Sequence, residues 1–308
     1  MNKKEFKTLD EQISIMESKG LIINNKEEVK DILLRENYFF INGYRHLFFN
    51  QDRKFIKGTK FSELYSAFLF DRNLRNIMFK NLLIVENNIK SIISYELSKK
   101  YGYVEKEYLN PSNFTKDFKE SRRVEDVLNK INRQIRVNVD KHSATLHYKN
   151  KYNYIPLWIL VKVLSFGLIN ELYGIMKDED KDKVANYYGI TSEELKVYLQ
   201  LLSNYRNLCA HEDMVYDHKT QVSIDDNKYH KLLNIEKNEE NEYIKGKNDL
   251  FSIIIIFKIM LQKPRFNELI REFNRALDTF DKNVDVIGND KLLNKMGFPS
   301  NYEIIIDL

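Results

Sequence analysis

Glycine and proline are scarce in this chain, and their scarcity limits the folds open to it. Only 10 glycines and 4 prolines occur in 308 residues, less than half of the roughly 12 % that these two residues contribute to average proteins. Because they supply most tight turns and helix breaks, a chain with few of them is built from long elements. Apolar residues recur with the period of an α-helix over most of the length, so the expected fold class is all-α.

The composition is that of a globular protein that needs no disulfides or metal ions to be stable. Hydrophobic residues make up 43 % and charged residues 31 % of the chain, which excludes a disordered polymer. A single cysteine excludes a disulfide framework and favours a reducing compartment, so we expect a cytoplasmic location. The start has no apolar signal region, and the apolar runs at 156–176 and 250–261 are too short or too charged to span a membrane. No membrane association is expected.

Helical periodicity divides the chain into a series of segments. The pattern predicts helices over residues 9–19, 26–36, 61–101, 120–137, 191–211, 249–262 and 265–279, and another that Pro156 opens. The longest should end at Gly102, with a break near 71–73 as an option. Thr191 and Glu194 have the spacing of a capping box. The helix after Pro156 is apolar on nearly every side, so we expect it to be the central one.

Two other segments are less regular. The aromatic-rich stretch 38–49 is interpreted as a packed connector whose rings fill the core. Residues 213–243 are polar and irregular, which favours a loop, with a small β-hairpin near 218–244 as an option. No repeat and no linker-like stretch interrupts the pattern, so residues 1–308 are expected to form one domain.

Few side chains can supply imidazole or thiol chemistry. Cys209 lies on an apolar helix without a histidine placed to activate it, so we expect a buried, inert thiol. His142 and His147 lack acidic or cysteine partners at metal-ligand spacing, and every glycine is isolated, which argues against a phosphate-binding loop. Neither a metal nor a cofactor is expected.

The remaining candidate is a polar stripe late in the 191–211 helix. Gln200, Asn204, Asn207 and His211 share one face at helical spacing, and Arg206 lies about 100° around the helix. One interpretation is a solvated stripe with Arg206 in a salt bridge. The other is RNA cleavage, in which a neutral imidazole takes the 2′-hydroxyl proton and a guanidinium holds the phosphate, with no metal needed.

Helix geometry adds a condition to the second interpretation. Five residues turn an α-helix by about 500°, so Arg206 and His211 point about 140° apart and lie about 7.5 Å apart along the axis. They can face one phosphate only if the helix end unwinds or a second copy of the chain contributes. In-line transfer also favours two imidazoles, and a homodimer with facing motifs would supply the second.

A resemblance to a known family supports RNA cleavage. Arg206 and His211, with four residues between them, resemble the Arg-x4–6-His signature of HEPN ribonucleases. The surrounding sequence resembles the Abi-like family of phage abortive-infection proteins (the AbiD and AbiF group). Three further blocks match in order, at residues 41–45, 83–90 and 156–167, so the resemblance covers about residues 10 to 220.

The resemblance implies a fold, an activity and a set of site residues. The fold would be a HEPN-like helical bundle, with its core at about 59–283 and extra N- and C-terminal helices. The activity would be that of a metal-independent endoribonuclease in phage defence, harmful to its own cell, with Arg206, Asn207 and His211 as catalytic residues. Glu86 and Asn87 would project toward this site; alternatively, Glu86 pairs with Lys90 on the helix surface. The implied partners are RNA, including a structured noncoding RNA, and a second copy of the chain.

RNA binding also requires positive surface outside the site. The net charge of +4 is too small to argue this alone. The densest basic and aromatic region runs from Lys99 to Tyr154, and its tyrosines can stack on unpaired bases. The arginines Arg122, Arg123, Arg133 and Arg136 of this region, together with Asn204, are the expected substrate-binding residues. An ordinary solvated helix would carry the same charges.

Two other functions remain open. The same fold could bind RNA or a partner protein without cutting, and Glu212 and Asp213 stand where relatives often carry an arginine. A membrane-active toxin is opposed by the lack of a spanning segment.

Overall fold

The prediction of an all-α fold is confirmed. The computed structural model describes residues 5–138 and 140–308, which form sixteen α-helices, three short 3-10 helices and no strand. The 3-10 helices are η1 (Pro111–Asn113), η2 (Phe118–Glu120) and η3 (Tyr302–Ile306). No helix in the described part of the chain is long and apolar enough to cross a bilayer.

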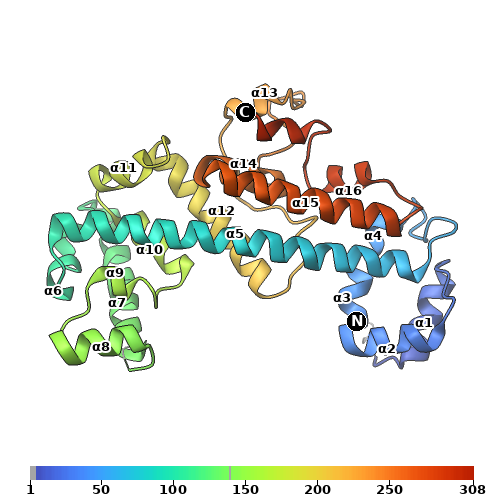
Figure 1. The fold of residues 1–308 in the computed structure, drawn as a ribbon, viewed down its shortest axis with the longest axis horizontal. Coiled ribbons are helices and arrows are strands. Elements are labelled where there is room, and N and C mark those ends of the chain that lie inside the picture. Colours follow the sequence, from blue (N-terminus) through green and yellow to red (C-terminus); the bar gives the residue numbers. More distant parts are fainter. Residues whose placement is uncertain (1–4, 139) are drawn as a thin grey trace.

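Helix α5 (Phe61–Tyr101) is the axis of the molecule. Its 41 residues give a length of about 60 Å, and it runs unbroken from one side of the fold to the other (Figure 1). The optional break near 71–73 does not occur, because Asp71 and Arg75 face each other one turn apart and form an ion pair along the helix. The helix ends as predicted at Gly102, whose φ of +94° is accessible to glycine.

The N-terminal helices pack at the start of α5. They are α1 (Leu9–Ser18), α2 (Lys26–Glu36), α3 (Tyr38–Gly43) and α4 (Arg45–Phe48), and the first two confirm the predicted helices at 9–19 and 26–36. The aromatic stretch forms α3 and α4, with Tyr44 and Phe48 in the core. The expectation that all its rings fill the core is wrong for Phe39 and Phe40, which are exposed because they lie on the outer face of α3.

The other side of the molecule holds shorter helices (Figure 1). These are α6 (Glu105–Tyr108), α7 (Ser121–Asn138), α8 (Ser143–Tyr152), α9 (Leu157–Leu160), α10 (Phe166–Ile175) and α11 (Asp178–Asn186). The expectation of a central helix after Pro156 is wrong. That apolar segment is divided into α9 and α10 because the Ser165 hydroxyl accepts a hydrogen bond from the Leu168 N–H (3.2 Å) and starts a new helix. The central position belongs to α5.

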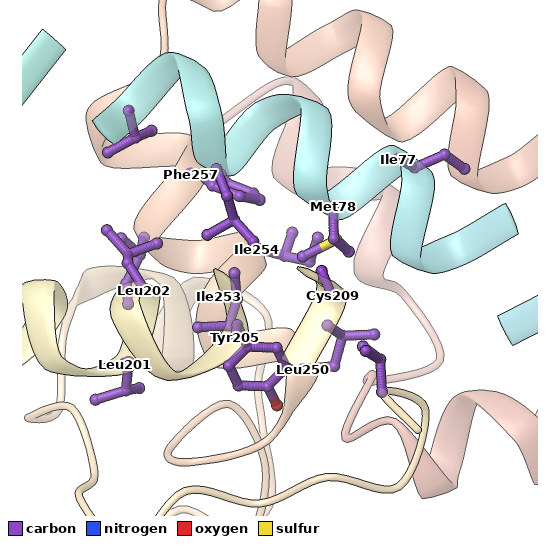
Figure 2. Packing of buried hydrophobic residues seen from close by; sticks show 14 of the residues in the cluster. Ile77, Met78, Leu201, Leu202, Tyr205, Cys209, Leu250, Ile253, Ile254 and Phe257 are labelled. Carbon is purple, nitrogen blue, oxygen red and sulfur yellow. The ribbon is translucent and has the colours of Figure 1, made fainter. Parts of the chain in front are cut away.

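The C-terminal part contributes α12 (Ser192–Ala210), α13 (Lys228–Leu232), α14 (Leu250–Met260), α15 (Lys263–Asn283) and α16 (Asn289–Lys295). The Thr191–Glu194 capping box is confirmed. Apolar side chains of α12 pack between α5 and α14 (Figure 2), and α15 lies along α5 (Figure 1). The optional hairpin at 218–244 is reduced to one antiparallel bridge between Lys237 and Tyr243.

Candidate functional site

The end of α12 keeps its helical form up to the candidate motif. The helix runs through Ala210, and the N–H of His211 still donates to the carbonyl of Asn207 at 3.0 Å. The chain then turns at Glu212, in a left-handed conformation with φ of +58°, and the Asp213 N–H returns to the Leu208 carbonyl. The helix therefore does not unwind before His211, and a single chain does not bring Arg206 and His211 to one point.

Arg206 points instead toward a buried carboxylate on α5. Its Nε lies 3.4 Å from Glu86 Oε2, and its guanidinium lies over the Phe79 ring at 5.9 Å from the centroid. Glu86 Oε1 accepts a hydrogen bond from Lys90 Nζ at 2.7 Å. Glu86 therefore pairs with Lys90 along α5 and also reaches Arg206. The pairing is not on the helix surface, because Glu86 and Lys90 are both buried.

The contact between Arg206 and Glu86 is an ion pair without a hydrogen bond. Both facing atoms, Nε and Oε2, are buried, yet neither has a hydrogen-bond partner among residues 5–138 and 140–308. Glu86 is 5 % exposed, whereas 29 % of the Arg206 side chain is exposed. Two cations thus surround one buried carboxylate, and the terminal amino groups of Arg206 have no hydrogen bond within the described chain. This arrangement leaves positive charge available to an anion.

The polar stripe of α12 is divided between free and engaged side chains. Asn207 and His211 are exposed, and within the described residues neither side chain forms a hydrogen bond or ion pair. Asn204 is engaged: its Oδ1 lies 2.7 Å from Nε2 of His218, a residue that the motif did not indicate. Burial lowers the pKa of His218, so its imidazole is neutral at neutral pH.

A second buried carboxylate fixes the segment that follows His211. Asp71 on α5 accepts hydrogen bonds from the Tyr44 hydroxyl at 2.7 Å and from the Tyr216 N–H at 2.8 Å. Arg75 binds Asp71 at 2.5 Å and donates to the carbonyl of Asp213 at 3.4 Å. Burial raises the pKa of Asp71, while these donors oppose the rise. The exit from α12 is thereby tied to α5 and to the end of α3.

Sequence reasoning missed this anchor. Asp71 and Arg75 stood on the buried side of the predicted helix with the i,i+4 spacing of an ion pair. A charged pair on an apolar face was the available signal, since buried charges need partners. Which backbone groups they bind depends on a contact over 140 positions along the chain, which no local pattern contains.

The basic residues expected to bind RNA lie apart from the motif. Arg122, Arg133 and Arg136 are exposed on α7, and Arg123 pairs with Glu120 at 3.1 Å. Helix α7 packs on α10, and α10 packs on α12. One helix therefore separates this basic face from the helix that carries Arg206.

Two further predictions concern Cys209 and metal ligands. Cys209 is buried as expected, and burial raises the pKa of its thiol to about 12, so it stays protonated and unreactive at neutral pH. In the described part of the chain, no group of three or more His, Cys, Asp and Glu side chains is arranged to hold a metal ion.

The fold and the site together define an all-α protein with an arginine and a histidine at the C-terminal end of α12, a helix whose apolar face is buried. Comparison with protein families places it more closely. The sequence model of the Abi-like proteins matches residues 31–217, so the chain belongs to the Abi-like protein family. This membership associates it with abortive-infection defence against phage. No curated protein and no solved structure matches the chain.

The extent of the match agrees with the position of the site. Residues 31–217 include α5, α12 and the loop held by Asp71, and they stop before α14 and α15. The helices that contain Glu86 and Arg206 are thus both within the family region. The two helices that cover them come from the remaining C-terminal part.

Proposed function

We propose that this protein is a metal-independent endoribonuclease of the HEPN type that acts in abortive infection, in the cytoplasm. The observation that carries the proposal is the placement of Arg206. Its Nε faces the buried Glu86 carboxylate at 3.4 Å, which orients the guanidinium and leaves both terminal amino groups for another ligand. Those groups form the fork that binds two phosphate oxygens at once.

The reaction follows from the groups at the end of α12. The imidazole of His211 takes the proton of a ribose 2′-hydroxyl, and the 2′-oxygen forms a bond to the adjacent phosphorus. Arg206 stabilises the negative charge that develops on the phosphate oxygens, and the Asn207 amide can donate a further hydrogen bond. The bond from phosphorus to the 5′-oxygen breaks, a second acid protonates that oxygen, and a 2′,3′-cyclic phosphate and a 5′-hydroxyl result.

A second copy of the chain is the proposed source of the second acid. Since α12 is regular through Ala210, Arg206 and His211 of one chain diverge by about 140°. A two-fold axis beside the exposed Asn207 and His211 would place the same patch of both chains in one cleft. The guanidinium of one chain could then meet the imidazole of its partner at one phosphate.

The exposed arginines of α7 would bind RNA outside this cleft. They lie one helix away from α12, so they suit a longer RNA rather than the phosphate that reacts. A structured noncoding RNA held on this face is the regulatory partner we propose.

The second candidate function is RNA binding without cleavage. The observation that favours it is the acidic pair Glu212 and Asp213, both exposed directly after His211. Negative charge there opposes the approach of a phosphate.

One experiment separates the two functions. The purified chain is incubated with cellular RNA in excess EDTA, beside His211→Ala and, as a matched control, His147→Ala, which removes an exposed histidine of α8. Cleavage by the wild type and the control, but not by His211→Ala, supports the ribonuclease. RNA that is retained intact by all three proteins supports the binding module.

A further inference from the structure

We propose that a pocket between α5 and α9 binds one unpaired nucleotide of an RNA strand next to the Arg206 site. The pocket has a volume of about 560 Å³, within the range of sites that enclose small ligands. It is lined by side chains of α5, the start of α8, and α9 with the residues after it: Asn87, Lys90, Ser91, Ser94, His142, Trp158, Val161 and Lys162. The inference rests on the proposed function for the identity of the ligand.

Trp158 gives the pocket an aromatic surface. Its side chain is 44 % exposed although its neighbours Leu157 and Leu160 are fully buried in the core. An exposed indole costs free energy in water, and it offers a large aromatic face on which an unpaired base can stack. Stacking is tolerant of sequence because every base has a π-face.

Positive charge lines the same pocket. Lys162 is exposed, and Lys90 is held at the back by its hydrogen bond with Glu86. No acidic residue lines the pocket itself. A ligand with an aromatic ring and a negative phosphate matches a surface that combines an indole with the ammonium group of Lys162, which is unpaired within the described residues.

The remaining lining residues offer hydrogen bonds to the edge of a base. The Asn87 side chain is exposed, and it lines this pocket although Glu86, one position before it, faces Arg206. His142 Nδ1 is buried and has no hydrogen-bond partner among the described residues. A buried ring nitrogen without a partner is unfavourable in the free protein, and a rotation of the imidazole ring toward the pocket would let a bound base supply the missing hydrogen bond.

Two neighbouring ion pairs connect the pocket with the proposed cleavage site. Lys90 binds Glu86, and Glu86 faces Arg206. Glu86 and Lys90 are one helical turn apart, about 6 Å along α5. A single strand can therefore place one base on Trp158 and a nearby phosphate at Arg206. A duplex cannot, because its bases are stacked on one another inside the double helix and leave no free face for the Trp158 ring.

The chain contains one tryptophan, so its fluorescence reports on this pocket alone. The test uses full-length His211→Ala, to prevent cleavage, and follows tryptophan emission during titration with an unstructured RNA oligonucleotide. The same sequence as a duplex and a nucleoside monophosphate form the other two arms. We expect saturable quenching by the single strand, and weak or no quenching by the duplex.

Substitutions measure how much the pocket contributes to the affinity for RNA. The affinity for a dye-labelled single strand is measured by anisotropy in the His211→Ala background. Since stacking contributes about 1–3 kcal/mol per base, Trp158→Ala should weaken binding about tenfold, and Trp158→Phe should retain part of it. Lys162→Ala should weaken binding and reduce its salt dependence. The control Lys282→Ala removes an exposed lysine at the end of α15 and should change affinity less than twofold.

The outcomes separate this inference from the proposed function. Quenching and a Trp158-dependent affinity in a protein that never cleaves RNA support the pocket and contradict the ribonuclease. Cleavage with no quenching, and with the same KM in Trp158→Ala, overturns the pocket and leaves the ribonuclease. Equal quenching by the duplex, tight saturation by the monophosphate alone, or no RNA binding in any arm also overturns the pocket.

Discussion

Glu86 Oε2 lies 3.4 Å from Arg206 Nε, and this ion pair links the long axial helix to the helix that carries the candidate motif. The carboxylate is buried and shared with Lys90, so Arg206, the proposed phosphate-binding group, is also a partner of a core charge. Its substitution should therefore affect stability as well as activity. From the sequence alone, Arg206 is a helix-surface residue, and its substitution by alanine is expected to change the free energy of unfolding by no more than about 0.5 kcal/mol.

Arg206→Ala should abolish RNA cleavage at a moderate cost in stability. We expect a loss of about 1 kcal/mol in the free energy of unfolding, because Glu86 keeps Lys90 as its counterion. Arg206→Lys should retain the stability but lose the bidentate phosphate contact, and with it most of the activity. Urea unfolding and cleavage of a labelled RNA measure the two effects. An Arg206→Lys protein with full activity would contradict the role of the fork.

Glu86→Gln should destabilise the fold more than Arg206→Ala does. It leaves Lys90, whose side chain is 10 % exposed, without its counterion, and an uncompensated buried charge costs about 3 kcal/mol. Adding Lys90→Met should recover most of this loss, because the buried ammonium group is then removed and the remaining cation, Arg206, is 29 % exposed to water. Urea unfolding of the wild type, both single variants and the double variant measures the coupling. Additive effects would show that the pair is not coupled.

Stability should depend on pH through Asp249 at the start of α14. Burial raises its pKa to about 6, although its carboxylate accepts hydrogen bonds from the Gly246 and Ser252 N–H groups. Between about pH 4 and 6 the folded chain keeps a proton that the unfolded chain has lost. This contribution to stability is therefore full below about pH 4 and disappears as pH rises through 6.

Asp249→Asn isolates that contribution, since the amide resembles the protonated acid and still caps the helix. The free energy of unfolding of the wild type relative to the variant should fall by about 2–3 kcal/mol from pH 4 to pH 7. Chemical denaturation across this range measures it. A difference that is constant with pH would show an ordinary carboxyl pKa in the fold.

Glu212→Gly should stabilise the protein. Glu212 holds a φ of +58°, which favours glycine and costs other residues about 1 kcal/mol. The expected rise in Tm is about 1–2 °C for a chain of 308 residues. Glu212→Ala is the matched control, because it removes the charge and keeps the strained conformation. If both variants gave the same rise, charge rather than conformation would be the cause.

A shared active site predicts a particular mixing curve. Wild-type and His211→Ala subunits are mixed and allowed to exchange, and RNA cleavage is measured against the fraction of wild type. If both histidines are needed, activity follows the square of that fraction, about one quarter at an equal mixture. Strictly proportional activity, or a monomer by light scattering that cuts RNA, contradicts the composite site.

Periodicity and capping were sufficient to predict much of the fold. The long helix ending at Gly102 and the capping box at Thr191 depend on nearest neighbours in the chain, and both are found in the structure. The prediction of one helix after Pro156 is wrong, because the apolar pattern continues through a serine that caps a second helix. A hydrophobic run indicates that a segment is buried, but it does not show where a helix begins. Here the second helix begins at the hydroxyl of Ser165.

The candidate site was only partly predictable. The resemblance led to Arg206, Asn207, His211 and Glu86, and the structure places Glu86 against Arg206. Asp71 and His218 were not found, because each acts on residues brought near by the fold rather than by spacing along one helix. Asn87 was expected at the motif, but it lines the pocket with Trp158.

The packing of α12 also has a consequence for the timing of biosynthesis. Its apolar side chains Leu202, Tyr205 and Cys209 belong to the same buried cluster as Ile253, Ile254 and Phe257 of α14, which packs on α12 and follows it in the chain (Figure 2). A ribosome must therefore complete α14 before the helix with the motif can dock on both sides. Until α14 has emerged, one apolar face of the helix that carries Arg206 and His211 stays without its partner.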